Sequence, residues 1–325
     1  MSSDEDLDFY RIWSEAERTL PLFSKGWWLD AVAPGRWGVS VVKKEDNIVA
    51  SMPYVRGGTV LRVITGPRIL GQPPFTQNLG PWISASAKTT SRGLSRQKFL
   101  METLIDQLPS YSYFRQNWHY DQTNWLPFFW RGFRQTTRYT YVIDDLSDIA
   151  ATLSRFDHSK RKDIRKARQI VTVSWDLSAE DFFQNHESTL GEQGKRISYD
   201  FKTFERIYNA AYLRKKGRTL GAYDAMGNLH AALFIVFDDM SAYNLVSTID
   251  PRFRSSGAAS LLVQEAITLS AKLGFAKFDF EGSMIEGVEN SFRKFGASQF
   301  QYHSLVHVPS RLIRLALASR DMTRL

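Results

Sequence analysis

The sequence contains no cysteine. This absence excludes disulfide bonds, zinc sites built on thiolates and a cysteine nucleophile. The six histidines include no helical His-x-x-x-His pair with an acid between them, so we predict no metal site. A Gly-x-Ser-x-Gly elbow, a P-loop and a Gly-x-Gly-x-x-Gly loop are also missing, which argues against a hydrolase, an NTPase and a dinucleotide-binding enzyme.

Long apolar runs are absent as well. No stretch approaches the ~18 residues that a membrane-spanning helix needs, and residues 1–8 are acidic where a signal peptide would be basic. We therefore expect a cytoplasmic protein without a transmembrane segment. Residues 309–318 are predicted to form a basic amphipathic helix, which either packs against the body of the protein or makes peripheral contact with a membrane.

Acidic residues are outnumbered by basic ones. The chain has 42 Lys and Arg against 34 Asp and Glu, for a formal net charge of +8. This balance favours an anionic partner such as a nucleotide-linked substrate, a phosphate-bearing cofactor, a nucleic acid or an anionic membrane face. A basic protein without any anionic ligand is an equally acceptable interpretation of charge alone.

The length and the apolar content indicate two folded domains. The chain has 325 residues, of which 43% are hydrophobic and 14% aromatic. Such a composition is typical of packed globular proteins, and the length is about twice that of a common domain. Turn-forming residues at 144–148 precede a strongly basic helix predicted over 155–168. We place the domain boundary there, with domains at 1–146 and 147–325.

Both halves combine strands with helices. Residues 37–42 and 48–52, joined by a polar turn, predict a hairpin in the first half, and residues 219–223 and 229–237 predict another in the second. A strand at 241–247, a helix at 257–273 and a strand at 277–280 follow. This order is typical of a right-handed parallel crossover, so we predict an α/β (α+β) fold with mixed, partly parallel sheets.

A phosphate-binding loop is predicted at the start of the helix of the crossover. Small residues there leave backbone N–H groups available to an anion, and two arginines add positive charge. Small residues at a helix start are also ordinary capping residues, and that alternative stays open. The candidate residues are Arg252, Arg254, Ser255, Ser256, Gly257, Ala258 and Ala259.

The spacing Arg254-x-x-Gly257-x-Ala259 resembles the acetyl-CoA pyrophosphate loop of the GNAT acetyltransferases. Residues 271–283 and 289–296 look like the C-terminal module of the Fem-like and CelD-like branch of that superfamily, and residues 161–167 and 75–82 resemble other segments of it. The resemblance implies two tandem GNAT-like domains, with the active site in or beside the second. It also implies acyl transfer to an amine of an envelope, sugar or peptide precursor.

The donor differs between branches of this superfamily. GNAT relatives use acetyl-CoA or another acyl-CoA, whereas the Fem transferases use aminoacyl-tRNA. The latter carry a Phe-Lys pair shortly before their Phe-Gly, and this chain has Phe292-Arg293-Lys294-Phe295 at that place. The departure favours acyl-CoA, with an aminoacyl-tRNA donor as the alternative. A GNAT-like scaffold that binds an anionic ligand without catalysis is the third interpretation.

Acyl transfer to an amine needs a group that accepts a proton. Glu281 follows the strand at 277–280 and is our first candidate for the base, because open α/β sheets bind ligands at the carboxyl ends of strands. Asp279 is the second candidate, and Tyr302 could protonate a departing thiolate. An acid before Gly-Ser could equally cap a turn, and a tyrosine in a strand is commonly a packing residue.

Three arginines are candidates for binding the acceptor. Arg161 and Arg165 lie four residues apart in the basic helix and could hold a phosphate of a nucleotide-linked acceptor. Arg293 lies in the segment that departs from the Fem pattern. A solvated, highly charged helix surface is the alternative interpretation of the same arginines.

Overall fold

The computed structural model describes residues 4–57, 59–60, 64–66, 68–84, 90–192, 194–282, 284–310 and 314. Contacts divide the chain into two compact units. Unit 1 comprises Met1–Arg138 and Gln301–Leu325, and unit 2 comprises Tyr139–Phe300. The last strand therefore belongs with the first unit, whereas the sequence prediction placed all of residues 147–325 in one domain. The helix predicted over 309–318 lies almost entirely outside the described residues.

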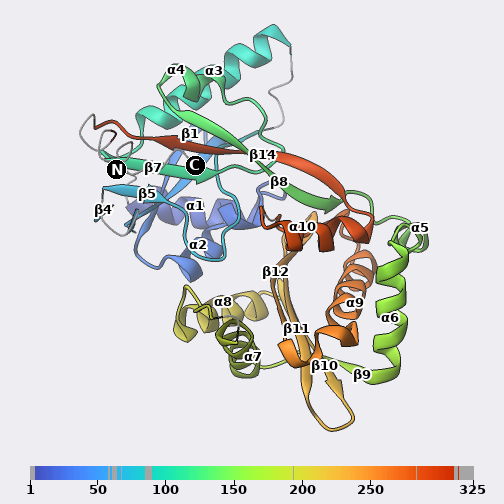
Figure 1. Ribbon diagram of the computed structural model, residues 1–325. Helices are drawn as coiled ribbons and strands as arrows, with labels where there is room; N and C mark the ends of the chain where they lie inside the picture. The colour runs from blue at the N-terminus through green and yellow to red at the C-terminus, as the bar shows by residue number, and fades with distance from the viewer. Residues whose placement is uncertain are drawn as a thin grey trace. The chain divides into compact units, whose positions relative to one another are not determined.

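Unit 1 is built on a sheet in the order β1-β2-β5-β7-β14, with β6 beside β2 and a separate β3–β4 pair (Figure 1). The predicted first hairpin is confirmed as β1 and β2. The β5–β7 pair is parallel and the other pairs are antiparallel. The strands are β1 (Trp37–Lys44), β2 (Asn47–Arg56), β3 (Thr59–Val60), β4 (Ile64–Thr65), β5 (Ile69–Gly71), β6 (Trp82–Ile83), β7 (Tyr113–Asn117) and β14 (Ser298–His307).

Helices cover the sheet of unit 1. Helix α3 turns Leu100, Met101 and Leu104 into a core that includes Phe114 and Trp118. Its first turn is capped by Thr90, whose hydroxyl accepts from the Gly93 amide, as expected for a threonine at a helix start. The helices are α1 (Asp4–Ala16), η1 (Leu22–Ser24), α2 (Gly26–Val32), α3 (Ser91–Asp106) and α4 (Leu126–Trp130).

Unit 2 has a sheet in the order β8-β13-β12-β11-β10-β9. The second predicted hairpin is confirmed as β10 and β11, and β12–β13 is the parallel pair that the strand–helix–strand pattern predicts. The strands are β8 (Arg134–Ile143), β9 (Val171–Trp175), β10 (Gly217–Asp224), β11 (Leu229–Phe237), β12 (Ser241–Ile249) and β13 (Lys277–Asp279).

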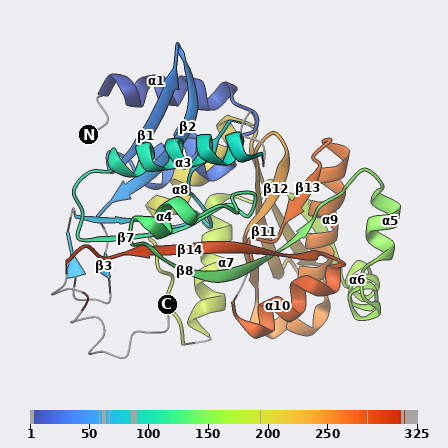
Figure 2. The same cartoon turned by 90° about the horizontal axis from the view of Figure 1, so that it is seen from above.

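The helices of unit 2 form two layers. Helices α6 and α9 pack together on one side of the sheet, and α7 and α8 pack together on the other, as Figures 1 and 2 show. The predicted mixed, partly parallel sheets flanked by helices are thus confirmed for both units. The elements are α5 (Ile149–Ser154), α6 (His158–Ile170), α7 (Ala179–Gly191), α8 (Phe201–Leu213), η2 (Pro251–Ser256), α9 (Ala258–Lys272), α10 (Glu286–Phe292) and η3 (Arg293–Phe295).

The basic helix is shorter than predicted. The sequence predicted one helix over 155–168, but α5 ends at Ser154 and α6 begins only at His158. Asp157 explains the break, because its carboxylate accepts from the Ser159 amide at 2.8 Å and caps α6.

Candidate active site

Strands β12 and β13 run parallel for only a short distance. Their pairing ends at Tyr243 and Asp279, although β12 continues to Ile249 with a register shift against β11 on the way. The chain after β13 follows β8 instead, because the Phe280 amide donates to the Tyr141 carbonyl at 2.9 Å. The two strands therefore part at their carboxyl ends, where open α/β sheets bind ligands.

Asp279 ends β13 and is only 2% exposed. Its Oδ1 accepts hydrogen bonds from Thr140 Oγ1 at 2.7 Å and from the Glu281 amide at 2.8 Å. Burial raises the pKa of Asp279 to about 6, although both hydrogen bonds favour the charged form. The carboxyl group is thus fixed in position and titrates not far below neutral pH.

Glu281 lies two residues further on. The residue is partly exposed, but its Oε1 atom is buried and has no hydrogen-bond partner among the described residues. Burial raises the pKa of Glu281 well above its usual range, and the neighbouring charge of Asp279 raises it further. A carboxyl group with a raised pKa beside a second acid is the setting in which proteins place general bases.

The backbone at this place is strained. Glu281 has a φ of 61° and Gly282 a φ of 64°, both in the left-handed region. This region costs a non-glycine residue roughly 1–2 kcal/mol. A Cβ atom on Gly282 would lie 2.5 Å from the Tyr139 carbonyl oxygen, so glycine is required there. Strained residues of this kind concentrate at functional sites, where their surroundings hold them in place.

The α9 loop, residues 251–257, leads from β12 into α9. Arg252 is engaged within the loop, because its guanidinium donates to both carboxylate oxygens of Asp250, the shortest contact being 2.6 Å. Ser256 is buried and its hydroxyl accepts from the Ala258 amide, so it caps the helix. Arg254 and Ser255 are exposed. Arg252 is exposed as well, although its guanidinium is paired with Asp250.

Gly257 is required for packing. Its φ is 80°, and a Cβ atom there would lie 2.2 Å from the carbonyl oxygen of Asp163 on α6. Close approach of two backbones is a standard reason for glycine. The sequence prediction attributed this glycine to the approach of a phosphate, whereas the structure accounts for it by contact between α6 and the loop.

Two lysines of α6 reach the α9 loop and the first turn of α9, and the sequence analysis did not single them out. Lys160 Nζ donates to Ser291 Oγ at 2.8 Å and to Ser260 Oγ at 3.3 Å, and burial lowers the pKa of this ammonium group. Lys166 Nζ donates to the carbonyl of Ser255 at 2.6 Å. The sequence could have indicated that Lys160 faces the protein interior. Lys160 lies four residues before the buried Ile164, and residues four apart share one face of a helix.

The predicted acceptor arginines lie elsewhere. Arg161 donates to the Ser154 carbonyl at 2.8 Å and thereby joins α6 to the end of α5, while Arg165 is exposed. Arg293 is exposed as well, and its guanidinium donates to Asn290 Oδ1 at 2.9 Å. Their role in binding an acceptor stays a prediction.

Tyr302 belongs to unit 1, because β14 passes from one unit into the other. Its hydroxyl accepts a hydrogen bond from Gln77 Nε2 at 3.1 Å. Within unit 2, only Asp279 and Glu281 of the three predicted catalytic residues lie together. The catalytic role of Tyr302 therefore stays a prediction.

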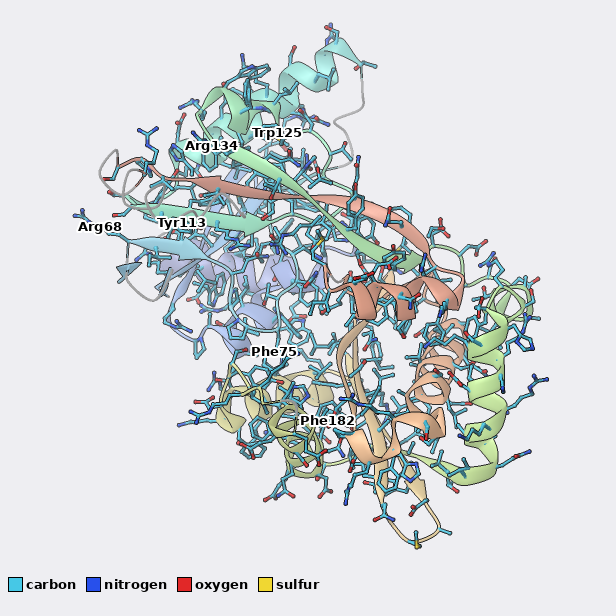
Figure 3. All side chains as sticks on the ribbon, viewed as in Figure 1. Arg68, Phe75, Tyr113, Trp125, Arg134 and Phe182 are labelled. Carbon is cyan, nitrogen blue, oxygen red and sulfur yellow. The ribbon has the colours of Figure 1, made fainter. Side chains whose placement is uncertain are left out.

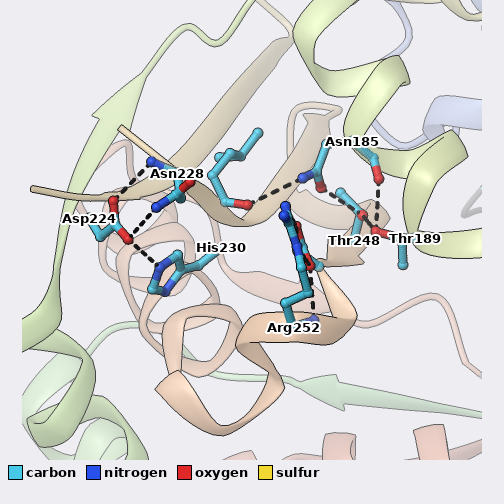
Figure 4. A network of polar contacts seen from close by, with 9 residues as sticks. Asn185, Thr189, Asp224, Asn228, His230, Thr248 and Arg252 are labelled. Carbon is cyan, nitrogen blue, oxygen red and sulfur yellow. Dashed lines mark hydrogen bonds and ion pairs between the residues drawn. The ribbon is translucent and has the colours of Figure 1, made fainter. Parts of the chain in front are cut away.

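A polar network supports the α9 loop from the β10–β11 hairpin (Figure 4). His230 stacks on Phe253 of the loop with ring centroids 3.8 Å apart, and its Nε2 lies 3.2 Å from Asp224 Oδ2. Hydrogen bonds from Asn228, chiefly, lower the pKa of Asp224 to about 2. His230 and Asp224 thus hold one side of the loop, and the Asp250–Arg252 pair holds its start.

The comparison with protein families concerns unit 2. Residues 154–297 match the family model described as the acetyltransferase (GNAT) domain. This stretch is therefore similar to a GNAT domain, and the α9 loop and the parting strands β12 and β13 lie inside it. The comparison with curated proteins found no match.

Solved structures extend the likeness over both units. FemX superposes with a TM-score of 0.64 at 11% identity, covering 93% of this chain and 96% of that chain. The C-terminal domain of a putative lysylphosphatidylglycerol synthetase from Agrobacterium fabrum gives a TM-score of 0.58 at 13% identity, covering 99% and 96%. A tandem GNAT protein from the clavulanic acid pathway gives 0.51 at 10%, covering 94% and 95%. The predicted resemblance to Fem-like, tandem GNAT proteins is confirmed at the level of fold.

Two further observations concern the described residues alone. No group of three or more His, Asp or Glu residues among them is arranged to hold a metal ion. None of the helices that they form is both long and apolar enough to cross a membrane.

Proposed function

We propose that this protein is an N-acyltransferase whose GNAT domain binds an acyl donor, acetyl-CoA or another acyl-CoA, and passes the acyl group to an amine. The observation that carries the proposal is Glu281, a strained and desolvated carboxyl group at the point where β12 and β13 part. The acceptor in this proposal is a small or nucleotide-linked amine of an envelope, sugar or peptide precursor.

The donor phosphates bind at the α9 loop in this proposal. The first N–H groups of an α-helix lack acceptors within the helix and attract anions. The exposed Arg254 and Ser255 flank that helix start, and Lys160 adds positive charge beside its first turn. Arg252 supports the start of the loop through its pair with Asp250, and its exposed guanidinium is a further donor for the phosphates in this proposal.

The chemistry requires one proton transfer at Glu281. The amine nitrogen attacks the acyl carbonyl carbon and forms the new C–N bond, while the carboxylate of Glu281 takes the proton that the nitrogen loses. Collapse of the tetrahedral intermediate breaks the bond to sulfur, and the leaving thiolate takes up the proton that Glu281 holds, which restores the carboxylate. Asp279 raises the proton affinity of Glu281 and fixes its backbone, because the Glu281 amide donates to Asp279 Oδ1.

Titration with acetyl-CoA and CoA tests the donor. We expect micromolar binding by calorimetry that weakens at least about tenfold in Arg254→Glu, because a charge reversal repels the phosphates. Arg254→Lys keeps the charge and serves as the matched control. Gly257→Glu is unsuitable, since any side chain at that position clashes with Asp163. Absence of binding to the native protein would rule out acyl-CoA.

Aminoacyl-tRNA is the second candidate donor. Exposed basic residues on α6, including Lys162 and Arg165, favour it because phosphate backbones bind such surfaces. FemX and a lysylphosphatidylglycerol synthetase also share the fold. Titration with charged tRNA, compared with the same tRNA uncharged, tests this donor. Binding of an anionic ligand with no acyl transfer to any amine would instead favour a non-catalytic scaffold.

A further inference from the structure

The surface of unit 1 carries exposed apolar side chains on two neighbouring helices. On α4, Leu126, Phe129 and Trp130 are 49%, 55% and 54% exposed, at positions i, i+3 and i+4 of one helix face. On α3, which packs beside α4, Leu94 is 46% exposed and lies four residues before Lys98, whose Nζ reaches Trp130 of α4. We call these four apolar residues the α3–α4 patch. Exposed apolar groups gathered in this way are typical of interaction sites.

The aromatic rings of the patch are held in place by their neighbours. Phe129 makes an edge contact with Trp125, their ring centroids lying 5.5 Å apart. Lys98 of α3 lies with its Nζ 4.9 Å from the centre of the Trp130 ring, which joins the two helices at the surface. Figure 3 labels Trp125 beside α4. Phe129 and Trp130 are therefore held on a helix, with their rings exposed to solvent.

The charge around the patch is positive. Arg92, Lys98 and Arg134 are exposed, and Arg134, labelled in Figure 3, begins β8 four residues after Trp130. The nearby acids are engaged, because Arg131 pairs with Asp106 at 2.7 Å and lies 4.0 Å from Glu102. The remaining charge at the patch is thus basic, which complements an anionic partner.

We propose that the α3–α4 patch docks the protein on an anionic phospholipid surface. Tryptophan and phenylalanine insert into the interfacial region of a bilayer, and lysine and arginine beside them bind the acidic headgroups. The patch combines both kinds of residue on adjacent helices. Docking through the patch places unit 1 on the membrane surface. This proposal is independent of the proposed acyl transfer, because it does not depend on the identity of the acceptor.

Vesicle sedimentation tests the proposal. We expect the full-length protein to bind phosphatidylglycerol-containing vesicles at least about fivefold more tightly than pure phosphatidylcholine vesicles, with the difference falling as salt rises. The double variant Phe129→Ser with Trp130→Ser should bind the anionic vesicles about tenfold more weakly. The matched control is Leu213→Ser, which removes an 82% exposed leucine from α8 of unit 2 and should bind as the native protein does.

A charge variant separates the two contributions. Lys98→Glu should weaken binding to anionic vesicles about fivefold or more and leave the phosphatidylcholine baseline unchanged. Circular dichroism checks that every variant is folded, which exposed positions should allow. The proposal is overturned if the native protein does not bind anionic vesicles, or if the double variant and Leu213→Ser bind equally. Self-association in sedimentation velocity that the double variant abolishes, without vesicle binding, would assign the patch to a second copy of the chain.

Discussion

The two units each contain a parallel strand–helix–strand crossover, β5–α3–β7 in unit 1 and β12–α9–β13 in unit 2, but the strand ends differ. In unit 1 the Gln72 side chain extends the ladder, since its Oε1 accepts from the Asn117 amide at 2.9 Å and its Nε2 donates to the Asn117 carbonyl at 3.3 Å. In unit 2 no described strand pairs with the β13 side of β12 beyond Tyr243. Two acids, Asp279 and Glu281, lie at the end of β13.

The comparison shows that two similar crossovers can differ at their strand ends. One end is bridged by hydrogen bonds, and the other presents titratable side chains. In unit 1 the strand end is bridged by the neutral amide of Gln72, which does not titrate. In unit 2 the pKa values of Asp279 and Glu281 are both raised by burial. We therefore expect changes at the unit 2 strand ends to affect catalysis, and changes at the unit 1 strand ends to affect only stability.

The largest expected effect concerns Glu281. Replacement by glutamine keeps the size of the side chain but removes the proton acceptor, so we expect kcat to fall about 100- to 1000-fold with donor affinity unchanged. Steady-state kinetics with acetyl-CoA and an amine acceptor measure the loss, and calorimetry measures the affinity. Glu286→Gln, at an exposed acid of α10, is the matched control. Equal activity in the two variants would remove Glu281 from the mechanism.

Asp279 should make stability depend on pH. Its pKa is about 6 in the folded protein against 3.8 ordinarily, so the folded state binds more protons between these values. The free energy of unfolding should therefore fall as pH rises from about 4 to 6, by on the order of 3 kcal/mol from this group. Denaturant unfolding across that range should show the fall in the native protein and a reduced fall in Asp279→Asn. Identical pH profiles would contradict the raised pKa.

Gly282 should be the most sensitive glycine at the strand end. Alanine there combines a positive φ with a Cβ atom 2.5 Å from the Tyr139 carbonyl oxygen, so we expect a loss of about 3 kcal/mol in unfolding free energy. Gly227 has a φ of 83° but open space around it, and Gly227→Ala should cost only about 1 kcal/mol. Thermal or urea unfolding measures both. If Gly282→Ala lowered the free energy of unfolding no more than Gly227→Ala does, the backbone of β8 at Tyr139 could shift at little cost to make room for the Cβ atom.

Gln72 should give the smallest effect. Gln72→Met keeps the side-chain length and removes the hydrogen bonds to Asn117, which we expect to cost about 1–2 kcal/mol of stability. Donor affinity and kcat should stay within about twofold of the native values, because the closed crossover of unit 1 takes no part in the chemistry. A selective loss of activity without loss of stability would show that unit 1 also contributes catalytic groups.

Much of the fold could be predicted from local patterns. The strand bounds at 229–237 are correct to the residue, because a polar turn precedes a mainly apolar run there. The break before α6 was missed, although Asp157 carries the capping signal. Asp279 and Glu281 could be proposed because an acid at the end of a strand is visible in a sequence.

The remainder depended on contacts between distant segments. The pairing of Arg252 with Asp250 is local and could have been expected, but Lys160 meets Ser291 across 131 positions of sequence. The placement of Tyr302 in unit 1 depends on where β14 goes after it leaves unit 2. A hydrophobic pattern sets which face of a strand is buried, but it does not tell which sheet neighbours the strand will have.

Strands β8 and β14 both start in one unit and end in the other. Unit 1 is therefore encoded by two separate pieces of the gene, and the piece that encodes unit 2 lies between them. A fragment cut after residue 146 would lack the terminal strand that pairs with β7, through contacts such as Val306 with Arg115. A single crossover in the coding sequence could not exchange one unit and leave the other whole, because unit 2 is inserted within unit 1.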